Sequence, residues 1–569
     1  NSYNFKREYA TRSFNTVYAS FDIWKGIKFA STFSYDFVMN KSRAWKDPRT
    51  SDGDDDNGRF SKDYNDITNM TWSNILTYQT KIKKKHNLDL LVGYEINSKE
   101  SDGLGTTISN FARWDKPEVN NGVVYQSMGG SNSTTRIVSY ITRANYDYDN
   151  KYYLGASWRT DGSSRLAREN RWGNFWSLSG AWRVSSESFM KPLQNWLSDL
   201  KLRVSYGVNG TLPSSYYGYM GLSSLTSNYN DNPGITQSQL ENKELTWETN
   251  YNFNSGIDLG FFDNRLNVTF EYYVRTTKNL LYSRPLSLAT GFSSYLANIG
   301  KLQNKGYELE IRSTNIETKD FRWSTSLNLG HNANKILKLD GDLKQVTSGT
   351  SIHKVGLPYS TYYMIEFAGI DPADGEPMFY KNTTDENGNL NKETTKDPRS
   401  AEKVILQCAD PTITGGLGNS ISYKWFDLNF NVNFSFGAWN YDGSASKLEH
   451  GGDGTLNIPI YYRKRWQKEG DETSIERFVV GRSISMTDYA TTRRLYSGDY
   501  VRLKNLTFGF TLPKTWTRKV GIDNIRLYAS GNNLLTWAAY DYIDPESGSS
   551  PSWDTPPMRT YTFGLEVKF

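Results

Sequence analysis

Long hydrophobic runs are missing from this sequence of 569 residues. No stretch approaches the roughly 18 consecutive apolar residues of a membrane helix, which excludes a helical membrane protein. Cysteine is nearly absent too: Cys408 stands alone, so an internal disulfide and a disulfide scaffold are excluded. An excess of one charge is also lacking, because 66 basic and 61 acidic residues leave a net charge of +5. Such a balance does not indicate nucleic-acid binding.

Catalytic signatures are lacking as well. The four histidines are scattered, and none belongs to a His-Glu-x-x-His zinc pattern. The sequence has no Gly-x-Ser-x-Gly nucleophile elbow and no phosphate-binding loop. We therefore expect a protein that is not an enzyme and that holds no cofactor.

Aromatic residues, by contrast, are abundant. They make up 15% of the chain, with 39 Tyr and 17 Trp, whereas apolar residues reach only 37% and mean hydropathy is -0.66. A globular core would be dominated by Leu, Ile and Val. This composition fits a membrane β-barrel, whose strands are half polar and whose aromatic residues form girdles at the two membrane interfaces.

The C-terminal residues 559–569 show the strand pattern most clearly, because side chains in a strand alternate between two faces. One face is entirely apolar: Tyr561, Phe563, Leu565, Val567 and Phe569. An edge strand of a soluble sandwich would alternate in the same way. The final aromatic residue favours the membrane, since Phe569 resembles the C-terminal assembly signal of bacterial outer-membrane barrels.

The same period of two recurs upstream, and short and long connections alternate along the chain. Residues 14–23 and 27–45 form the first predicted hairpin. Further short connections are predicted at 148–151, 261–265, 315–320 and 423–426, and two short helical ones at 186–197 and 514–521. Long connections are predicted at about 46–66, 103–133, 210–242, 282–302, 335–411, 442–498 and 538–556.

This asymmetry predicts orientation, since outer-membrane barrels keep short turns on the periplasmic side and large loops outside. The pattern gives about 17 strands, an odd number that cannot close as an even bacterial barrel. We therefore expect strands from an upstream segment to complete the barrel, one of them pairing with the strand that ends at Phe569. A β-propeller is the alternative, but the hairpins share no blade-like repeat.

From Asp161 onward the chain carries a specific set of motifs. They include Asp161-Gly162-Ser163-Ser164-Arg165, Trp172-Gly173, Ala181-Trp182-Arg183, Asn304-Lys305-Gly306-Tyr307-Glu308, Gly369-Ile370-Asp371-Pro372, Tyr500-Val501-Arg502-Leu503-Lys504-Asn505-Leu506 and Asp544-Pro545-Glu546. In this order they resemble the SusC/RagA family of TonB-dependent outer-membrane transporters, over residues 161–569.

The resemblance implies an all-β fold, a transmembrane antiparallel β-barrel of the bacterial outer membrane of about 22 strands. Residues 1–569 would form its C-terminal portion, without the plug domain. The implied function is TonB-dependent uptake of oligosaccharides or peptides. A siderophore or cobalamin receptor, and a non-transport barrel such as an adhesin, are the alternatives.

The resemblance also implies partners. A SusD-like surface lipoprotein would act as a lid over the barrel, and TonB-ExbB-ExbD would act through the missing plug segment. The upstream barrel and plug portion of the same protein would pair with this chain. Transporter and lipoprotein would form a dimer of pairs, and no nucleic acid is involved.

Two groups of loop residues are candidate sites. Aromatic faces stack on sugar rings and peptide groups, and the candidates are Tyr359, Tyr362, Tyr363, Phe379, Trp439, Tyr441, Tyr540, Tyr542 and Trp553; packing within the loops is the alternative. Asp52, Asp54 and Asp56 have the spacing of a calcium loop, but Asn57 replaces the turn glycine and Asp63 the final Glu. A solvated loop is the alternative there.

Overall fold

The structure is a computed structural model that describes residues 3–230, 232–339, 341, 343–385, 388–452, 457–481, 489–540, 542–547 and 556–569. One sheet contains 17 strands. They are β1 (Phe5–Trp24), β2 (Ile27–Lys46), β3 (Arg59–Ile82), β4 (His86–Phe111), β5 (Gly122–Tyr148), β6 (Tyr152–Ser163), β7 (Trp172–Arg183), β8 (Leu197–Thr211), β11 (Glu248–Phe261), β12 (Leu266–Lys278), β15 (Lys301–Glu317), β16 (Phe321–Lys338), β24 (Ile413–Tyr423), β25 (Phe426–Phe436), β28 (Tyr500–Thr511), β29 (Asn524–Ala538) and β30 (Thr560–Lys568).

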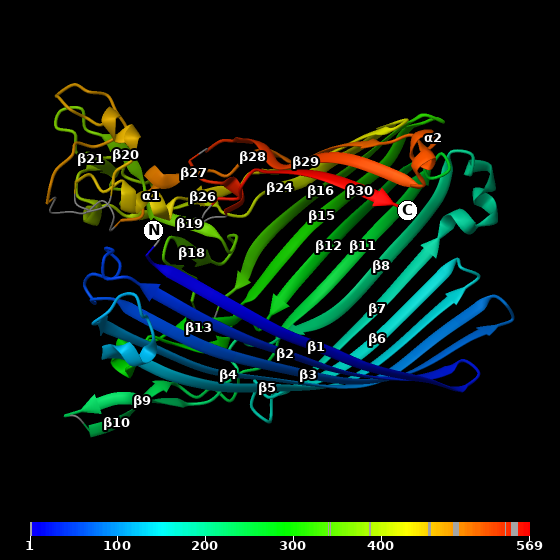
Figure 1. The fold of residues 1–569 in the computed structure, drawn as a ribbon, viewed down its shortest axis with the longest axis horizontal. Helices are drawn as coiled ribbons and strands as arrows, with labels where there is room; N and C mark the ends of the chain where they lie inside the picture. The colour runs from blue at the N-terminus through cyan, green and yellow to red at the C-terminus, as the bar shows by residue number, and fades with distance from the viewer. Residues whose placement is uncertain are drawn as a thin grey trace. The chain divides into compact units, whose positions relative to one another are not determined.

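The chain divides into two compact units. The first contains residues 1–182, 204–253 and 277–299. In it β1 to β7 pair in sequence order, each antiparallel to the next. Figure 1 shows β1 to β5 running side by side in blue to cyan. Because consecutive strands pair, tight connections such as the one between Tyr148 and Tyr152 are sufficient, as the sequence predicted.

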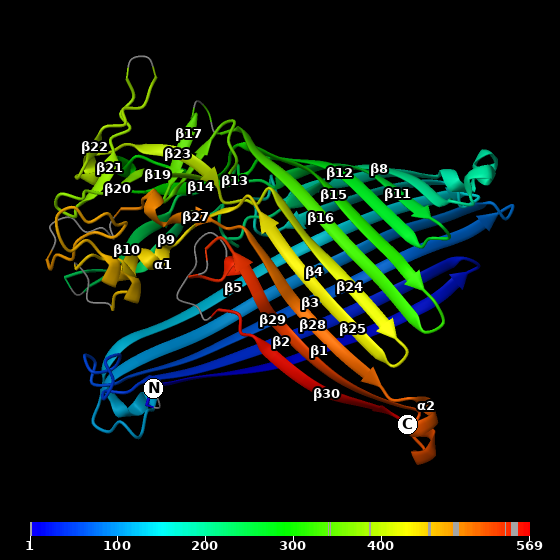
Figure 2. The same ribbon diagram turned by 90° about the horizontal axis from the view of Figure 1, so that it is seen from above.

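The second unit contains residues 183–203, 254–276 and 300–569. Its ladder joins β15, β16, β24, β25, β28, β29 and β30, again antiparallel. Figure 2 shows the last of these strands lying side by side in yellow to red. The terminal strand β30 pairs with β29 from Asn524 opposite Lys568 to Asn532 opposite Thr560. The strand predicted at 559–569 is confirmed.

Alternation along the strands separates an apolar face from a polar one. In β6 the side chains of Leu154 and Trp158 are 62% and 42% exposed. On the opposite face Arg159 contacts Asp161, with 2.6 Å between Nε and Oδ1, and Ser157 lies 2.7 Å from Ser177. An exposed apolar face beside a hydrogen-bonded polar face is the pattern of a strand with lipid on one side.

Short helices occupy the two connections where the sequence predicted them. The first contains η2 (Val184–Ser186) and η3 (Ser188–Leu193), and the second contains α2 (Lys514–Thr517) and η8 (Arg518–Val520). Met190 of η3 is buried with Val184 and Leu197. In the described residues, no helix is long and apolar enough to cross a membrane.

Two predicted loops are corrected by the structure. Residues 46–66 and 103–133 were expected to be loops, but β3 begins at Arg59 and the β4–β5 hairpin turns only between Phe111 and Gly122. The reason is a small core at the outer end of these strands, which sequence patterning did not show. Its buried members are Trp45, Phe60, Ile108 and Phe111. This core holds polar strands together beyond the stretch that alternation identifies.

The other predicted loops contain secondary structure of their own. Residues 210–242 include the hairpin β9 (Leu222–Tyr229) and β10 (Asn232–Gln239), and residues 282–302 include β13 (Leu281–Pro285) and β14 (Ser294–Asn298). Of residues 538–556, the segment 548–555 lies outside the described residues. The two longest predicted loops, 335–411 and 442–498, fold together into one structure.

Candidate functional site in the long loops

The two longest connections of the second unit form one structure, which we call the loop platform (residues 339–412 and 437–499). Its strands are β17 (Gln345–Ser348), β18 (Ser351–Lys354), β19 (Thr361–Ile365), β20 (Phe367–Ile370), β21 (Pro377–Tyr380), β22 (Thr394–Thr395), β23 (Lys403–Cys408), β26 (Trp439–Tyr441) and β27 (Leu495–Ser497). It also contains the helices η5 (Pro398–Ser400), α1 (Gly443–Leu448), η6 (Ile460–Lys464) and η7 (Thr492–Arg494). Figure 2 shows these elements gathered beyond one end of β24 and β28.

Backbone contacts interlock the two loops. Ile365 forms a parallel bridge with Thr491, and the Phe367 amide donates to the Thr492 hydroxyl at 3.0 Å. At a second place, Trp466 Nε1 donates to the Pro372 carbonyl at 3.0 Å. Neither loop is therefore a bare connection, because each supplies hydrogen-bond partners to the other.

The Gly-Ile-Asp-Pro motif forms part of this junction. Lys396 Nζ lies 2.6 Å from Asp371 and 2.7 Å from Asp374, and this contact lowers the pKa of both carboxyl groups and raises the pKa of the lysine. Gly375 has a φ of +72°, and a Cβ there would lie 2.5 Å from the Trp466 ring. The motif therefore fixes a tight turn against the neighbouring loop.

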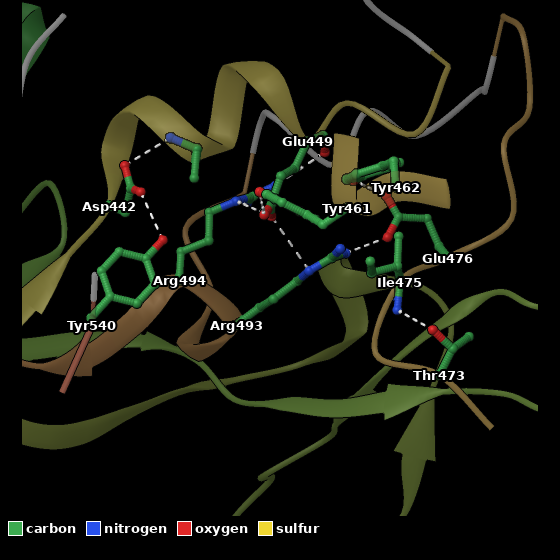
Figure 3. A network of polar contacts seen from close by, with 11 residues as sticks. Asp442, Glu449, Tyr461, Tyr462, Thr473, Ile475, Glu476, Arg493, Arg494 and Tyr540 are labelled. Atoms are coloured by element: carbon green, nitrogen blue, oxygen red, sulfur yellow. Dashed lines mark hydrogen bonds and ion pairs between the residues drawn. The ribbon is translucent and has the colours of Figure 1, made fainter. Parts of the chain in front are cut away.

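A buried ionic network lies at the centre of the platform (Figure 3). Glu476 is fully buried, forms an ion pair with Arg493, and accepts a hydrogen bond from the Tyr462 hydroxyl at 3.0 Å. Glu449 lies 3.6 Å from Arg493 Nε and 3.2 Å from Arg494 Nε. Two carboxylates thus face two guanidinium groups, so the buried charges balance, which a low-dielectric interior requires.

The network fixes protonation states. Burial acts to lower the pKa of Arg493, but the carboxylates of Glu476 and Glu449 outweigh it and raise that pKa above its ordinary value. Burial and the nearby carboxylates raise the pKa of Tyr461 and of Tyr462. Arg493 therefore stays charged, and the phenols of Tyr461 and Tyr462 stay neutral hydrogen-bond donors.

An aromatic cluster adjoins this network. The Tyr540 ring stacks on Tyr496 with 3.7 Å between centroids, and its hydroxyl donates to Asp442 at 3.1 Å (Figure 3). Tyr542 lies 5.3 Å from Tyr540 and 5.4 Å from Tyr461, and it is 68% exposed. Burial, and then Asp442, raises the pKa of Tyr540. The cluster is a rigid aromatic base with one exposed ring, suited to stacking on a flat ligand group.

The other aromatic candidates lie in different surroundings. Tyr362, Phe379 and Tyr441 are 3%, 0% and 8% exposed and pack in the cores of the platform, so they present no free ring face. The Tyr359 ring stacks on His353 at 4.1 Å. Tyr363 and Trp439 are partly buried, and Trp553 lies outside the described residues. The structure thus brings together only Tyr540 and Tyr542 as an accessible group.

A third buried cation ties the 544–546 segment to the sheet. Arg502 of β28 is 1% exposed, and its guanidinium donates to Asp544 at 2.6 Å and to Glu546 at 2.8 Å. Lys504 lies 2.7 Å from Glu546. The sequence showed both motifs but not their contact, although a strand motif with two cations and a loop motif with two acids are complementary in charge.

Sequence reasoning missed the ionic network itself. Glu449 and Glu476 are single acids in polar surroundings, and their partners lie 17 to 45 residues away in the chain. The one signal was the pair Arg493-Arg494 in the same long loop as Tyr461-Tyr462, since adjacent cations in a loop with paired phenols are typical partners of buried acids.

The predicted calcium residues are engaged with other groups. Asp52 accepts from the Asn4 side-chain amide at 3.0 Å, and Asp56 pairs with Arg59 at 2.9 Å. No three His, Cys, Asp or Glu side chains in the described residues group as metal ligands. Calcium binding at Asp52, Asp54 and Asp56 stays a prediction.

The family model described as TonB dependent receptor-like, beta-barrel matches residues 1–534. The chain belongs to this family. It is the β-barrel portion of a TonB-dependent receptor of the SusC/RagA type. The predicted fold class, localisation and family are confirmed, and the 17-stranded sheet is the barrel portion of that fold.

Three relatives show how far the similarity extends. TonB-dependent receptor P3 of Formosa agariphila is 32% identical over 97% of this chain and 57% of its own length. TonB-dependent receptor SusC of Bacteroides thetaiotaomicron is 30% identical over 76% of this chain and 44% of its own. A structure of the RagAB peptide transporter gives a TM-score of 0.89 at 27% identity, over 100% of this chain and 63% of that chain. The chain thus spans less than two thirds of these relatives.

Proposed function

We propose that the complete protein imports oligosaccharides or peptides across the outer membrane, with energy supplied through TonB. The observation that carries this proposal is the loop platform. Loops longer than about 15 residues are usually functional or disordered, and these two fold into an interlocked structure with a charge-balanced buried network. The chain is similar in structure to the RagAB peptide transporter, with a TM-score of 0.89. This similarity supports a substrate of the proposed kind, with peptides as one of the two candidate classes.

In this proposal the Tyr540 and Tyr542 rings contact the substrate. The stack on Tyr496 and the hydrogen bond to Asp442 hold Tyr540 in place. Tyr542 is free to stack on a sugar ring or a peptide group, because two thirds of its surface is exposed. Asp442 already caps α1 through the Ala445 amide at 2.8 Å, so it acts in positioning Tyr540 rather than in binding.

The partner is a SusD-like surface lipoprotein that docks on the platform and covers the substrate. Large apolar side chains are exposed there: Ile460 is 75% and Val480 is 83% exposed. Exposed apolar groups on an otherwise polar surface mark protein interaction sites. A matched control exists in the first unit, where Leu288 is 80% exposed in a different loop.

Co-purification tests this docking. The variant Ile460→Asp/Val480→Asp should reduce recovery of the lipoprotein with the complete transporter at least tenfold, whereas Leu288→Asp should leave recovery unchanged. Full recovery with the double variant would place the interface elsewhere. Removing the whole loop 335–411 is a poor test, because the Thr491–Arg494 segment would lose its partners Ile365 and Phe367.

Substrate class is tested by uptake in cells that lack the native gene and carry a plasmid copy. Labelled oligosaccharides and labelled peptides are supplied separately, and Tyr542→Ala is compared with the unaltered protein. We expect one class to accumulate, and the variant to raise the half-saturating concentration of that class severalfold. Equal uptake by the variant and the unaltered protein would remove Tyr542 from the binding site.

A further inference from the structure

The apolar face of the first unit contains a groove that no step of import uses. It has a volume of about 580 Å³ and lies across β5, β6, β7 and β8. Leu154, Leu178 and Val204 line it and are 62%, 57% and 50% exposed. Ala144 and Gly180 also line it and give it depth between these larger residues. All of these side chains lie on the face that meets lipid.

Aromatic side chains lie on the strands of the groove to either side of its apolar lining. Toward the short turns, Tyr152 stacks on Trp182 at 6.3 Å, and Tyr148 continues the row at 6.3 Å from Tyr152. At the other end Trp158 lies opposite Trp176 on the neighbouring strand. From Tyr152 to Trp158 the strand rises about 20 Å. Tyr and Trp mark the level of the lipid headgroups, so the first row sets the depth of one membrane interface.

Positive charge collects beside the Tyr148 row. The β3–β4 turn contains Lys83, Lys84 and Lys85, all exposed. The turn adjoins the next one along, because the Asp149 amide donates to the Lys85 carbonyl at 2.7 Å. Two acids lie at the neighbouring turn: Asp149, 3.5 Å from Lys85 Nζ, and Asp147, which accepts from the Asn87 side-chain amide. Lys151 ends that turn, so four lysines face two acids. The turns therefore keep an excess of positive charge next to the end of an apolar groove.

We propose that the groove holds one acyl chain of an anionic phospholipid whose phosphate lies at the Lys83–Lys85 turn. Charge complementarity selects this occupant: the walls of the groove are apolar and uncharged, whereas the adjoining turn is cationic and lies at the headgroup level. Near a membrane surface each lysine attracts anionic lipid appreciably. A second copy of this chain would present the same excess of lysines and would meet like-charge repulsion.

Gly180 offers a substitution that fills the groove without disturbing the sheet. A Cβ at this position would lie 3.9 Å from its nearest neighbours, Leu154 Cδ2, the Tyr153 carbonyl and Val204 Cγ1. Gly180→Leu thus adds apolar bulk to a lipid-facing site that has room for it. The matched control is Val92→Phe, because Val92 is 58% exposed on the same face of β4 and does not line the groove.

The charges can be tested in the same way. Lys83 and Lys84 have φ values of 48° and 59°. Asn tolerates this left-handed conformation, so Lys83→Asn/Lys84→Asn removes two positive charges and preserves the backbone of the turn. The control is Lys41→Gln/Lys99→Gln, which removes two positive charges from the far halves of β2 and β4. Every variant of the complete protein is first checked for a folded, heat-modifiable barrel.

Native mass spectrometry of the complete protein in detergent, titrated with phosphatidylglycerol or with phosphatidylethanolamine, measures the occupancy. We expect one phosphatidylglycerol to be retained, with at least tenfold weaker binding in Gly180→Leu and unchanged binding in Val92→Phe. The lysine variant should weaken phosphatidylglycerol binding and leave phosphatidylethanolamine unaffected. Equal retention by Gly180→Leu, or no preference for the anionic lipid, would overturn the proposal. So would loss of a protein dimer in Gly180→Leu, because a second copy would then be the occupant.

Discussion

Arg493 is the residue on which the loop platform depends most. Arg493→Met would leave Glu476 fully buried with no cationic partner, and removing one member of a buried ion pair costs about 3–5 kcal/mol. Loss of Arg493 also affects the other loop of the platform, because the Arg493 guanidinium lies 5.6 Å from the ring centroid of Phe367 in residues 339–412. The strands of the sheet do not depend on it, so the barrel should still fold.

Limited proteolysis of intact cells measures this effect. A cost of that size raises the population of opened platform by roughly two to four powers of ten, since each factor of ten corresponds to about 1.4 kcal/mol. We expect rapid cleavage within residues 442–498, with heat-modifiable barrel unchanged. Arg493→Met/Glu476→Gln should recover most of the resistance, because the neutral amide carbonyl still accepts from Tyr462.

The control is Arg399→Met, which breaks an exposed pair with Asp397 that contributes at most about 1 kcal/mol. Cleavage of this variant should match the unaltered protein. If Arg493→Met were as resistant to protease as the control, the ionic network would not hold the platform together.

Three more predictions follow from other parts of the chain. Arg49 lowers the pKa of Asp47 to about 2, so the Asp47 carboxylate stabilises the 47–58 loop fully above about pH 4, and this stabilisation is lost as pH falls through 2. Asp47→Asn should therefore weaken amide protection at Thr50 by about 1–2 kcal/mol at pH 7 and have almost no effect near pH 1; a pH-independent loss would contradict this. Deleting Phe569 should reduce the amount of folded barrel in the outer membrane, and unchanged levels would remove its role as an assembly signal. A tag within residues 383–391 should be labelled on intact cells and one at Lys83–Lys85 only after permeabilisation; surface labelling at the lysines would invert the orientation.

The sequence predicted the half of each strand that meets lipid, because lipid imposes a strict alternation there. Short turns such as the one between Tyr148 and Tyr152 were found for the same reason: apolar alternation stops on both sides of them. The family resemblance rested on motifs that the structure places both within strands, as at Asn304–Glu308 of β15, and at turns, where a particular residue is needed. Gly375 against Trp466 is one such place.

The outer halves of the strands could not be predicted from alternation. Beyond the membrane both faces of a strand meet water or polar loops, so β4 and β5 show no apolar period between residues 103 and 133. The outer end of β4 is held against β3 by Phe60 and Ile108, which lie 48 residues apart in the sequence. The buried network of the loop platform could not be predicted for a related reason: the charge of Glu476 is neutralised by Arg493, which belongs to a different element.

In the proposed function, this barrel belongs to an energy-driven importer. The most direct test is accumulation of the labelled substrate class in cells that carry the complete gene, compared with the same cells lacking TonB and with cells treated with a proton uncoupler. The account predicts concentrative uptake that disappears in both. Uptake that persists without TonB, or that only equilibrates with the medium, would contradict it.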